Sequence, residues 1–186
     1  MPEHRDTTPE PLRLLESFLW HDFDAGLADW SAWLARKLPT EPENATSYDR
    51  AMQLHAALRQ LEAINNGLPA GAGLHADADA DAEAQAQAQA HDALNQLIET
   101  CRIHPCLTGA GTLALVCDNA DPDPVARLLL VMLAALQSGL WRRFKLCRDP
   151  GCRASYYDAS KPAAKTWCSM DTCGSRNKMR RFRARG

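Results

Sequence analysis

Four cysteines near the carboxyl end constrain this chain more than any other feature. They fall into two pairs, Cys147/Cys152 and Cys168/Cys173, with four residues inside each pair and fifteen between the pairs. Zn²⁺ favours four soft ligands in a tetrahedron, and thiolates suit it. Residues 149–151 (Asp-Pro-Gly) form turns readily, as a tight bend back to a metal requires. The spacing therefore predicts one structural Zn²⁺ per chain, with no ligand position left open for water or substrate.

Two other interpretations of these cysteines stay open at this stage. The usual zinc spacing is Cys-x2-Cys, so two Cys-x4-Cys pairs are a less specific signal. The four thiols could instead be buried in a small hydrophobic patch, or they could form two disulfides. The chain has seven cysteines, an odd number, and nothing in it indicates an oxidising compartment. These observations favour metal binding in a reducing compartment over paired disulfides.

Charge is divided unevenly along the chain. Residues 141–186 hold 13 Lys and Arg against 3 Asp and Glu, whereas residues 1–140 hold 8 against 20. The net charges are therefore +10 and −12, although the whole chain carries only −2. This asymmetry indicates a basic module that meets a polyanion and is carried by an acidic body. The competing interpretation is a solvated basic tail docked on that body.

The tail that follows Cys173 is predicted to be a helix with two basic flanks. At 100° per residue, one flank carries Arg176, Arg180 and Arg183, and the other carries Lys178, Arg181 and Arg185. Met179 and Phe182 fall between the flanks and are expected to pack on the zinc core. Cations on both flanks suit two rows of phosphates, and guanidinium can also read guanine edges. These six basic residues are the candidate nucleic-acid-binding set.

The same segment resembles the CGNR zinc finger, a family named after the Cys-Gly-Asn-Arg at its second cysteine pair. The tetrapeptide here is Cys-Gly-Ser-Arg at residues 173–176, so Ser175 replaces the Asn. Residues 156–160 (Tyr-Tyr-Asp-Ala-Ser), residues 167–170 (Trp-Cys-Ser-Met) and Lys178 stand where the family has its aromatic-Asp-x-Ser, Trp-Cys-Ser-Met and basic positions. Ser175 is a departure from the family pattern that leaves the four metal-ligating cysteines unchanged.

The resemblance implies an architecture and a function. In this family an α-helical domain, called ABATE, usually precedes the finger, and the proteins are described as stress-induced bacterial transcription regulators. We therefore expect an ABATE-like helical domain at residues 1–140 and a CGNR-type finger with a basic tail helix at residues 141–186. Family members tend to carry Asn-Thr after a Phe-aliphatic pair in the first helix, where this chain has Trp20 and His21.

Hydrophobic periodicity predicts a mainly α fold: a helical bundle with one small β-hairpin, followed by a small ββα-like zinc finger with four cysteine ligands. The expected helices cover residues 11–22, 29–38, 46–68, 90–101 and 124–140. The hairpin is expected at residues 102–117, and the finger strands at residues 153–158 and 165–167. Thr46 or Ser47 is the expected cap of the third helix, and Asp123 that of the last. The last helix is the most hydrophobic, so it should lie centrally and deliver a finger packed on the body.

Residues 76–90 alternate Ala with Asp, Glu or Gln. This low-complexity insertion defines no helical face and makes a poor strand, so we expect a partly helical segment without chemistry. Cys101, His104 and Cys106 could form a second metal site. Pro105 and the alternation of a strand would splay these side chains, however, so small buried thiols are the favoured interpretation of Cys101, Cys106 and Cys117.

A further candidate is a ligand pocket at Phe18, Trp20 and His21. The alternative is a packed, hydrogen-bonded histidine in the domain core. The chain has no apolar run of membrane-spanning length and no signal-peptide pattern, so we expect a cytoplasmic protein without a membrane partner.

Taken together, these features predict a zinc-containing DNA-binding regulator of the stress response. Its helical domain would sense a small-molecule effector or mediate assembly, for example as a homodimer. The alternative is a protein- or RNA-interaction module whose zinc is purely structural. No catalytic motif supports an enzyme.

Overall fold

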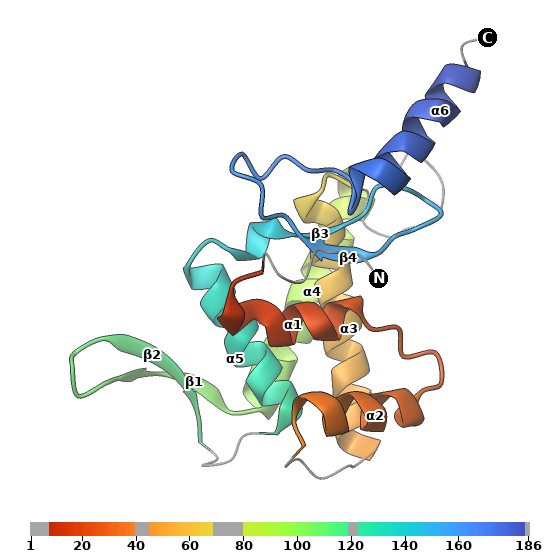
Figure 1. Ribbon diagram of the computed structural model, residues 1–186. Coiled ribbons are helices and arrows are strands. Elements are labelled where there is room, and N and C mark those ends of the chain that lie inside the picture. Colours follow the sequence, from red (N-terminus) through yellow and green to blue (C-terminus); the bar gives the residue numbers. More distant parts are fainter. Residues whose placement is uncertain (1–7, 40–44, 69–79, 119–122, 185–186) are drawn as a thin grey trace.

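The computed structural model describes residues 8–39, 45–68, 80–118 and 123–184. The body consists of the helices η2 (Glu10–Leu12), α1 (Arg13–Trp20), α2 (Leu27–Lys37), α3 (Ala45–Asn65), α4 (Ala80–Thr100) and α5 (Pro124–Gln137). Between α4 and α5 lies an antiparallel hairpin of β1 (Ile103–Leu107) and β2 (Leu113–Cys117). The finger comprises η3 (Trp141–Arg143), β3 (Phe144–Leu146), β4 (Ser155–Tyr157), η4 (Met170–Gly174) and α6 (Ser175–Arg183). The predicted fold class is confirmed (Figure 1).

The helix ends follow local chemistry. Asp123 caps α5 by accepting a hydrogen bond of 2.9 Å from the Ala126 N–H, as predicted, and Pro124 opens the first turn. At the end of α3, Gly67 adopts φ +59°, and the Leu68 N–H donates back to the Ala63 carbonyl. The expected start of α3 is wrong, because the helix begins at Ala45 and Ser47 lies fully buried inside it.

The central element is α3 rather than α5. It contacts α1, α2, α4, α5, η3 and β3, whereas α5 contacts α1, α3, η2, η3 and β2. Small side chains at Ala51 and Ala57 are buried beside Leu54 and Leu58, which lets neighbouring helices approach α3 closely. Leu136 near the end of α5 is 46% exposed. The expectation of a central α5 is therefore corrected, because hydrophobicity alone did not show which helix has neighbours on most sides.

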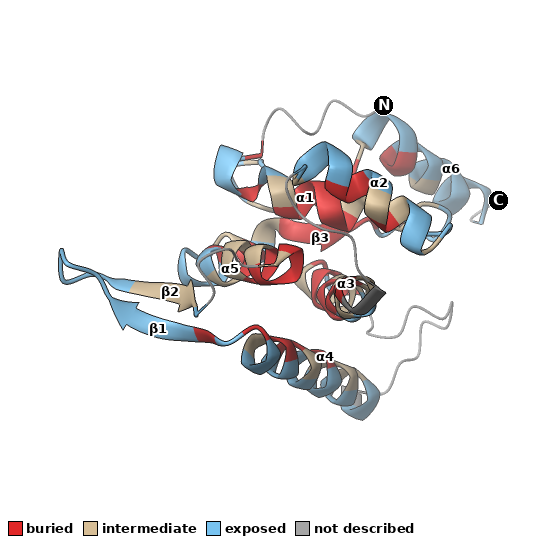
Figure 2. Cartoon of the chain, turned by 90° about the horizontal axis from the view of Figure 1, so that it is seen from below, coloured by how far each residue is buried: buried red, intermediate tan, exposed pale blue. Residues whose placement is uncertain are grey.

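Most of the low-complexity insertion is helical. Its described part, from Ala80 onward, continues without a break into the amphipathic remainder of α4, while residues 76–79 lie outside the described part of the chain. Ala90, Leu94 and Leu97 form the buried edge of α4, which packs on α3, and the opposite face is exposed (Figure 2). The high helix propensity of alanine thus lets α4 continue beyond its packed part as a solvent-exposed helix.

The β1–β2 hairpin projects from the body (Figure 1). Cys101 is buried and Cys117 is half-buried, but Cys106 is exposed. The interpretation of Cys106 as a buried thiol is therefore wrong, because β1 has a packing partner only at its Ile103 end. His104 Nδ1 lies 3.3 Å from Asp118 Oδ1. Among the described residues, Cys101, His104 and Cys106 do not come together as a group of metal ligands.

The main hydrophobic core runs from the body into the finger. Trp141, Phe144 and Tyr157 belong to the same buried cluster as the inner faces of α1, α3 and α5. Both finger strands contact the body, β3 on α3 and β4 on α1. The expectation that the finger packs on the body is confirmed.

Among the described helices, none combines the length and the apolar character that crossing a bilayer requires.

Candidate functional site: a four-cysteine metal centre and its basic helix

The four predicted cysteines converge on one point. The Sγ atoms of Cys147, Cys152, Cys168 and Cys173 all lie within 4.8 Å of one another. The Cys152–Cys168 and Cys168–Cys173 sulfur distances are both 3.7 Å. A tetrahedral zinc with Zn–S bonds of about 2.3 Å places its sulfurs about 3.8 Å apart, whereas a disulfide needs about 2.05 Å. The cluster therefore fits one structural zinc ion and excludes disulfides among these four residues.

Electrostatics within the cluster also favour a cation. The Cys168 thiol and the backbone N–H groups of Cys168 and Asp149 hydrogen-bond to Cys147 and lower the pKa of Cys147 to about 5. Burial raises the pKa of Cys173 to about 11. Donation to the Cys147 sulfur raises the pKa of Cys168. Packed thiols thus cannot all ionise by themselves, and a divalent cation supplies the charge that lets four thiolates coexist.

Backbone geometry shapes the two cysteine arches. Cys147 follows β3, and its N–H donates to the Ala154 carbonyl at 2.9 Å. The first arch closes when the Cys152 N–H donates to the Asp149 carbonyl, also at 2.9 Å. In the second arch, the Ser169 hydroxyl caps the π-helical turn η4 by accepting from the Thr172 N–H. A turn closed by a backbone hydrogen bond therefore shapes the first arch, and a capped π-helical turn shapes the second.

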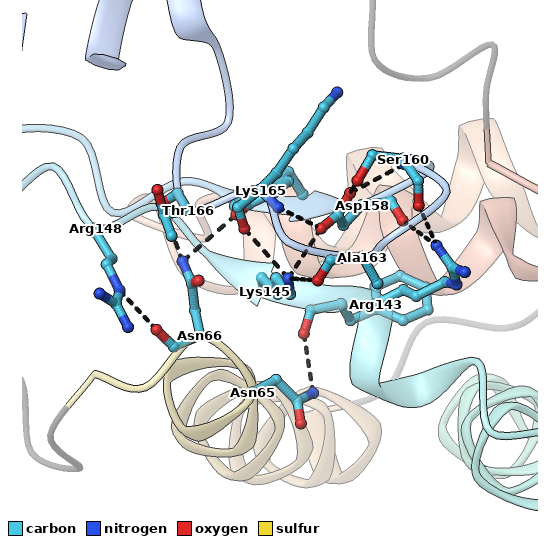
Figure 3. A network of polar contacts seen from close by, with 12 residues as sticks. Asn65, Asn66, Arg143, Lys145, Arg148, Asp158, Ser160, Ala163, Lys165 and Thr166 are labelled. Atoms are coloured by element: carbon cyan, nitrogen blue, oxygen red, sulfur yellow. Dashed lines mark hydrogen bonds and ion pairs between the residues drawn. The ribbon is translucent and has the colours of Figure 1, made fainter.

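A buried ion pair organises the loop between the arches (Figure 3). Lys145 Nζ lies 2.9 Å from Asp158 Oδ2, and both side chains are almost fully buried. Asp158 also accepts from the Ser160 N–H, the Ser160 hydroxyl and the Lys165 N–H, at 2.6–3.0 Å. These contacts explain the Asp-x-Ser pattern, because one carboxylate satisfies the turn that returns the chain to Cys168.

The predicted finger strand at residues 165–167 is wrong. Side chains occupy its carbonyls: Tyr156 Oη donates to the Lys165 carbonyl at 2.7 Å, and Asn66 Nδ2 donates to the Thr166 carbonyl at 3.0 Å. The strand that pairs with β4 is instead β3, before the first cysteine, with Phe144 opposite Tyr157. A stretch of three residues carries too little pattern to separate these two pairings.

The end of α3 forms a polar joint with the finger (Figure 3). Asn65 Nδ2 donates to the Trp141 and Phe144 carbonyls at 3.0 and 2.9 Å. Asn66 Nδ2 donates to the Leu146 carbonyl at 2.7 Å, and Arg148 Nε donates to the Asn66 carbonyl, also at 2.7 Å. Nothing in the sequence singles out Asn65 and Asn66 for this role. A pair of Asn residues at a helix end gives no signal of its distant partners.

Asp149 anchors the basic helix to the first arch. Its Oδ2 lies 2.7 Å from Arg176 Nη1, and its Oδ1 lies 3.1 Å from Arg180 Nη2. The Asp149 side chain is fully buried, while the two arginines are 51% and 49% exposed. Burial alone would raise the pKa of Asp149, but hydrogen bonds from Arg180 and the Gly151 N–H, together with the charge of Arg176, hold it below its usual range. Two predicted nucleic-acid-binding arginines therefore also position α6.

Beyond this anchor, α6 projects clear of the molecule (Figure 1). None of its residues is buried, and Met179 and Phe182 are 52% and 76% exposed. The expectation that these two pack on the zinc core is wrong. Tyr156 and Trp167 pack around the four sulfurs instead, and the Asp149 anchor turns the Arg176–Arg180 flank toward the arch.

The other predicted basic residues lie on the free surface of α6. Lys178, Arg181 and Arg183 are exposed and, within the described residues, form no ion pair. Arg185 lies outside the described part of the chain. The structure thus leaves three basic side chains of α6 free, while Arg176 and Arg180 lie on the flank that contacts Asp149.

The proposed pocket residues lie in and around a packed aromatic cluster. Phe18 is fully buried, with ring centroids 5.6 Å from Phe23 and 6.2 Å from Trp30. The His21 ring lies 4.7 Å from that of Phe23, and His21 and Trp20 are only half-buried. Phe18 therefore packs in the core of the body, and only Trp20 and His21 of the three predicted pocket residues reach solvent.

Comparison with known proteins supports the metal centre. The model of the CGNR zinc finger family matches residues 143–186, which include all four cysteines, the Asp158 loop and α6. No curated protein matches the chain. The carboxyl-terminal quarter of the chain is thus similar to the CGNR zinc finger, as its motifs predicted.

Proposed function

We propose that this protein is a zinc-containing DNA-binding protein whose α6 enters a groove of the duplex. The observation that carries the proposal is the free helix. None of its residues is buried, and it projects away from the body (Figure 1). A helix with side chains is about 10–12 Å wide and the major groove is about 12 Å wide, so a helix must be free around most of its circumference to enter.

The charges on α6 suit this role. Lys178, Arg181 and Arg183 are available for phosphates or base edges, and the half-exposed Arg176 and Arg180 can meet the DNA backbone from the anchored flank of α6. The acidic body lies behind the finger, with a net charge of −12 over residues 1–140. This separation of charge would orient the molecule as it approaches DNA, with α6 leading.

As part of the same proposal, the protein regulates transcription under stress, and the helical body acts as an ABATE-type domain that senses an effector or mediates assembly. The alternative function is a protein- or RNA-interaction module with a structural zinc. The specific observation in its favour is the exposure of Met179 and Phe182 on α6, because large exposed apolar side chains often mark protein contacts.

The test is the salt dependence of binding to a fluorescently labelled duplex, measured by anisotropy on the full-length, zinc-loaded protein. The logarithm of affinity should fall linearly with the logarithm of salt concentration, and Lys178→Ala should reduce that slope by about 1 if the side chain contacts a phosphate. Lys37→Ala, which removes the same charge from an exposed position on α2, is the matched control and should leave the slope unchanged.

Failure to bind duplex at low salt would refute the proposed function. Equal effects of Lys178→Ala and Lys37→Ala would refute the role of α6.

A further inference from the structure

A groove of about 670 Å³ lies between α6 and the π-helical turn η4. Its lining includes Trp167, Met170, Asp171, Lys178, Arg181 and Phe182. The volume lies within the range of roughly 300–1,000 Å³ found for small-molecule sites. The groove runs along the flank of α6 that faces away from the Asp149 anchor.

Gly174 shapes the base of this groove. A Cβ at residue 174 would stand 3.1 Å from Met170 Sδ and Cε and 3.3 Å from Trp167 Cδ1. Because glycine has no Cβ, Met170 and Trp167 can lie directly against the helix root. The apolar wall next to the zinc centre therefore depends on this glycine.

Two aromatic side chains line the groove without touching each other. Trp167 is half-buried beside the sulfur cluster, and Phe182 is 76% exposed on α6. No ring contact joins them in the described part of the chain. The groove that both residues line has room for a planar group, and aromatic faces stack well on bases.

The polar residues of the groove narrow the choice of ligand. Lys178 and Arg181 are exposed cations at its edge, and Asp171 supplies an acceptor. A nucleotide matches all of these features, because its phosphates are anionic, its base is flat, and base amino groups donate hydrogen bonds. An acidic peptide would suit the cations but would bring its carboxylates close to Asp171.

We propose that this groove binds one unpaired base of the nucleic acid, stacked between Trp167 and Phe182, with the flanking phosphates on Lys178 and Arg181. The proposal rests on the proposed nucleic-acid function and adds a ligand class to it. The protein then prefers a duplex that contains an unpaired nucleotide over the same duplex fully paired.

The experiment uses the full-length, zinc-loaded protein and two labelled duplexes that differ by one unpaired 2-aminopurine. Stacking between aromatic side chains should quench the 2-aminopurine fluorescence on binding. Phe182→Ala should reduce the quenching and lower affinity for the bulged duplex at least about fivefold, with little effect on the paired one. Met179→Ala removes another exposed apolar side chain of α6 that does not line the groove, and it should change neither signal.

The outcomes separate this inference from the proposed function. Salt-dependent binding of both duplexes with equal affinity and no quenching would overturn the groove proposal and leave α6 as a duplex-binding element. Quenching that survives Phe182→Ala unchanged would overturn it as well. Absence of binding to either DNA would overturn both proposals. Both would also be overturned if the protein bound an acidic peptide but no DNA, and if Phe182→Ala weakened that peptide binding.

Discussion

Asp149 links the metal centre to the basic helix through a single side chain. It lies between two zinc ligands in sequence, its own side chain is fully buried, and both of its oxygens accept hydrogen bonds from arginines of α6. The sequence marked Asp149 only as a turn former. Arg176 and Arg180 were identified as cations for a polyanion, although a buried carboxylate in the same finger is a nearer partner.

We expect Asp149→Asn to loosen α6 without releasing zinc. The change removes the negative charge that holds two guanidinium groups, and lost hydrogen bonds to charged partners typically cost about 1.5–3 kcal/mol. Amide hydrogen exchange should quicken in α6 while the zinc content stays constant. Asp171→Asn, at an exposed position of the same finger, is the control. Unchanged exchange in α6 would show that Asp149 is not the anchor.

Glu62 carries a buried carboxyl under the finger. Burial raises its pKa to about 8, against the opposing effects of the Ser155 hydroxyl, which donates to Oε1, and of the Arg59 charge. Its other oxygen, Oε2, is buried and has no hydrogen-bond partner in the described structure. The folded protein therefore keeps Glu62 protonated at neutral pH, whereas the unfolded chain does not.

This difference predicts the direction of a pH dependence. The folded-state pKa is above the ordinary value of 4.5, so the stabilising contribution is complete below that pH and is lost as the pH rises toward about 8. Glu62→Gln should flatten this part of the profile and stabilise the fold at pH 8 by about 1–4 kcal/mol. Urea unfolding at pH 5 and pH 8 measures both effects. Parallel profiles for the two proteins would contradict this assignment.

At the scale of elements, α3 connects the body to the finger. Asn65 is its last residue and Asn66 follows it, and their side-chain amides donate to the Phe144 and Leu146 carbonyls at the two ends of β3. The amide of Asn66 also reaches the loop before Cys168. One helix end thus fixes the strand and the return path to the second cysteine arch.

Asn66→Ala should weaken this joint. Two carbonyls, those of Leu146 and Thr166, lose their amide donor, and leaving buried acceptors unpaired costs about 1–3 kcal/mol per group. Thermal unfolding should shift to lower temperature, and exchange should rise in β3 and in the loop before Cys168. Asn95→Ala, at an exposed site on α4, should have little effect. If Asn66→Ala changed stability and exchange as little as Asn95→Ala does, these hydrogen bonds would not hold the joint.

Local signals predicted most elements of the fold. The period of apolar residues placed the helices, Asp123 marked the start of α5, and a hairpin was expected at residues 102–117, where β1 and β2 pair. The failures concern choices that depend on distant partners. Three-residue strands in the finger gave no basis for pairing β4 with β3, and the exposure of Met179 and Phe182 depends on the anchor at Asp149.

The candidate site shows the same division between local and distant information. Cysteine spacing predicted all four zinc ligands, because the chemistry of the metal fixes the residue type and a short arch fixes the spacing. The groove between Trp167 and Phe182 could not be predicted, since it depends on how η4 turns the chain into α6. The sequence thus identified the individual motif residues, but it did not show the groove that forms where their side chains meet.

At the scale of the whole molecule, the hydrophobic core and the metal centre stabilise different parts of the finger. Phe144 and Tyr157 belong to the core of the body, whereas Tyr156 and Trp167 pack around the sulfurs. The pair β3–β4 therefore has support that does not need the metal. The segment from Cys168 to α6 is instead held by the sulfur cluster and by Asp149.

Cys168→Ser should separate these two supports. The change removes a soft ligand from the centre of the cluster, so zinc content should fall well below one ion per chain. Hydrogen exchange should then rise from Cys168 to the end of α6, while β3, β4 and α3 keep their protection. Zinc retained at one ion per chain would contradict the ligand assignment. Loss of protection throughout the body would contradict the independent support of β3–β4.

The most direct test of the account is X-ray absorption at the zinc edge of the full-length protein, because it reports the ligands themselves. The account predicts a single shell of four sulfur atoms at about 2.3 Å, supplied by Cys147, Cys152, Cys168 and Cys173. A shell containing nitrogen or oxygen, or a purified protein that carries no zinc, would contradict it.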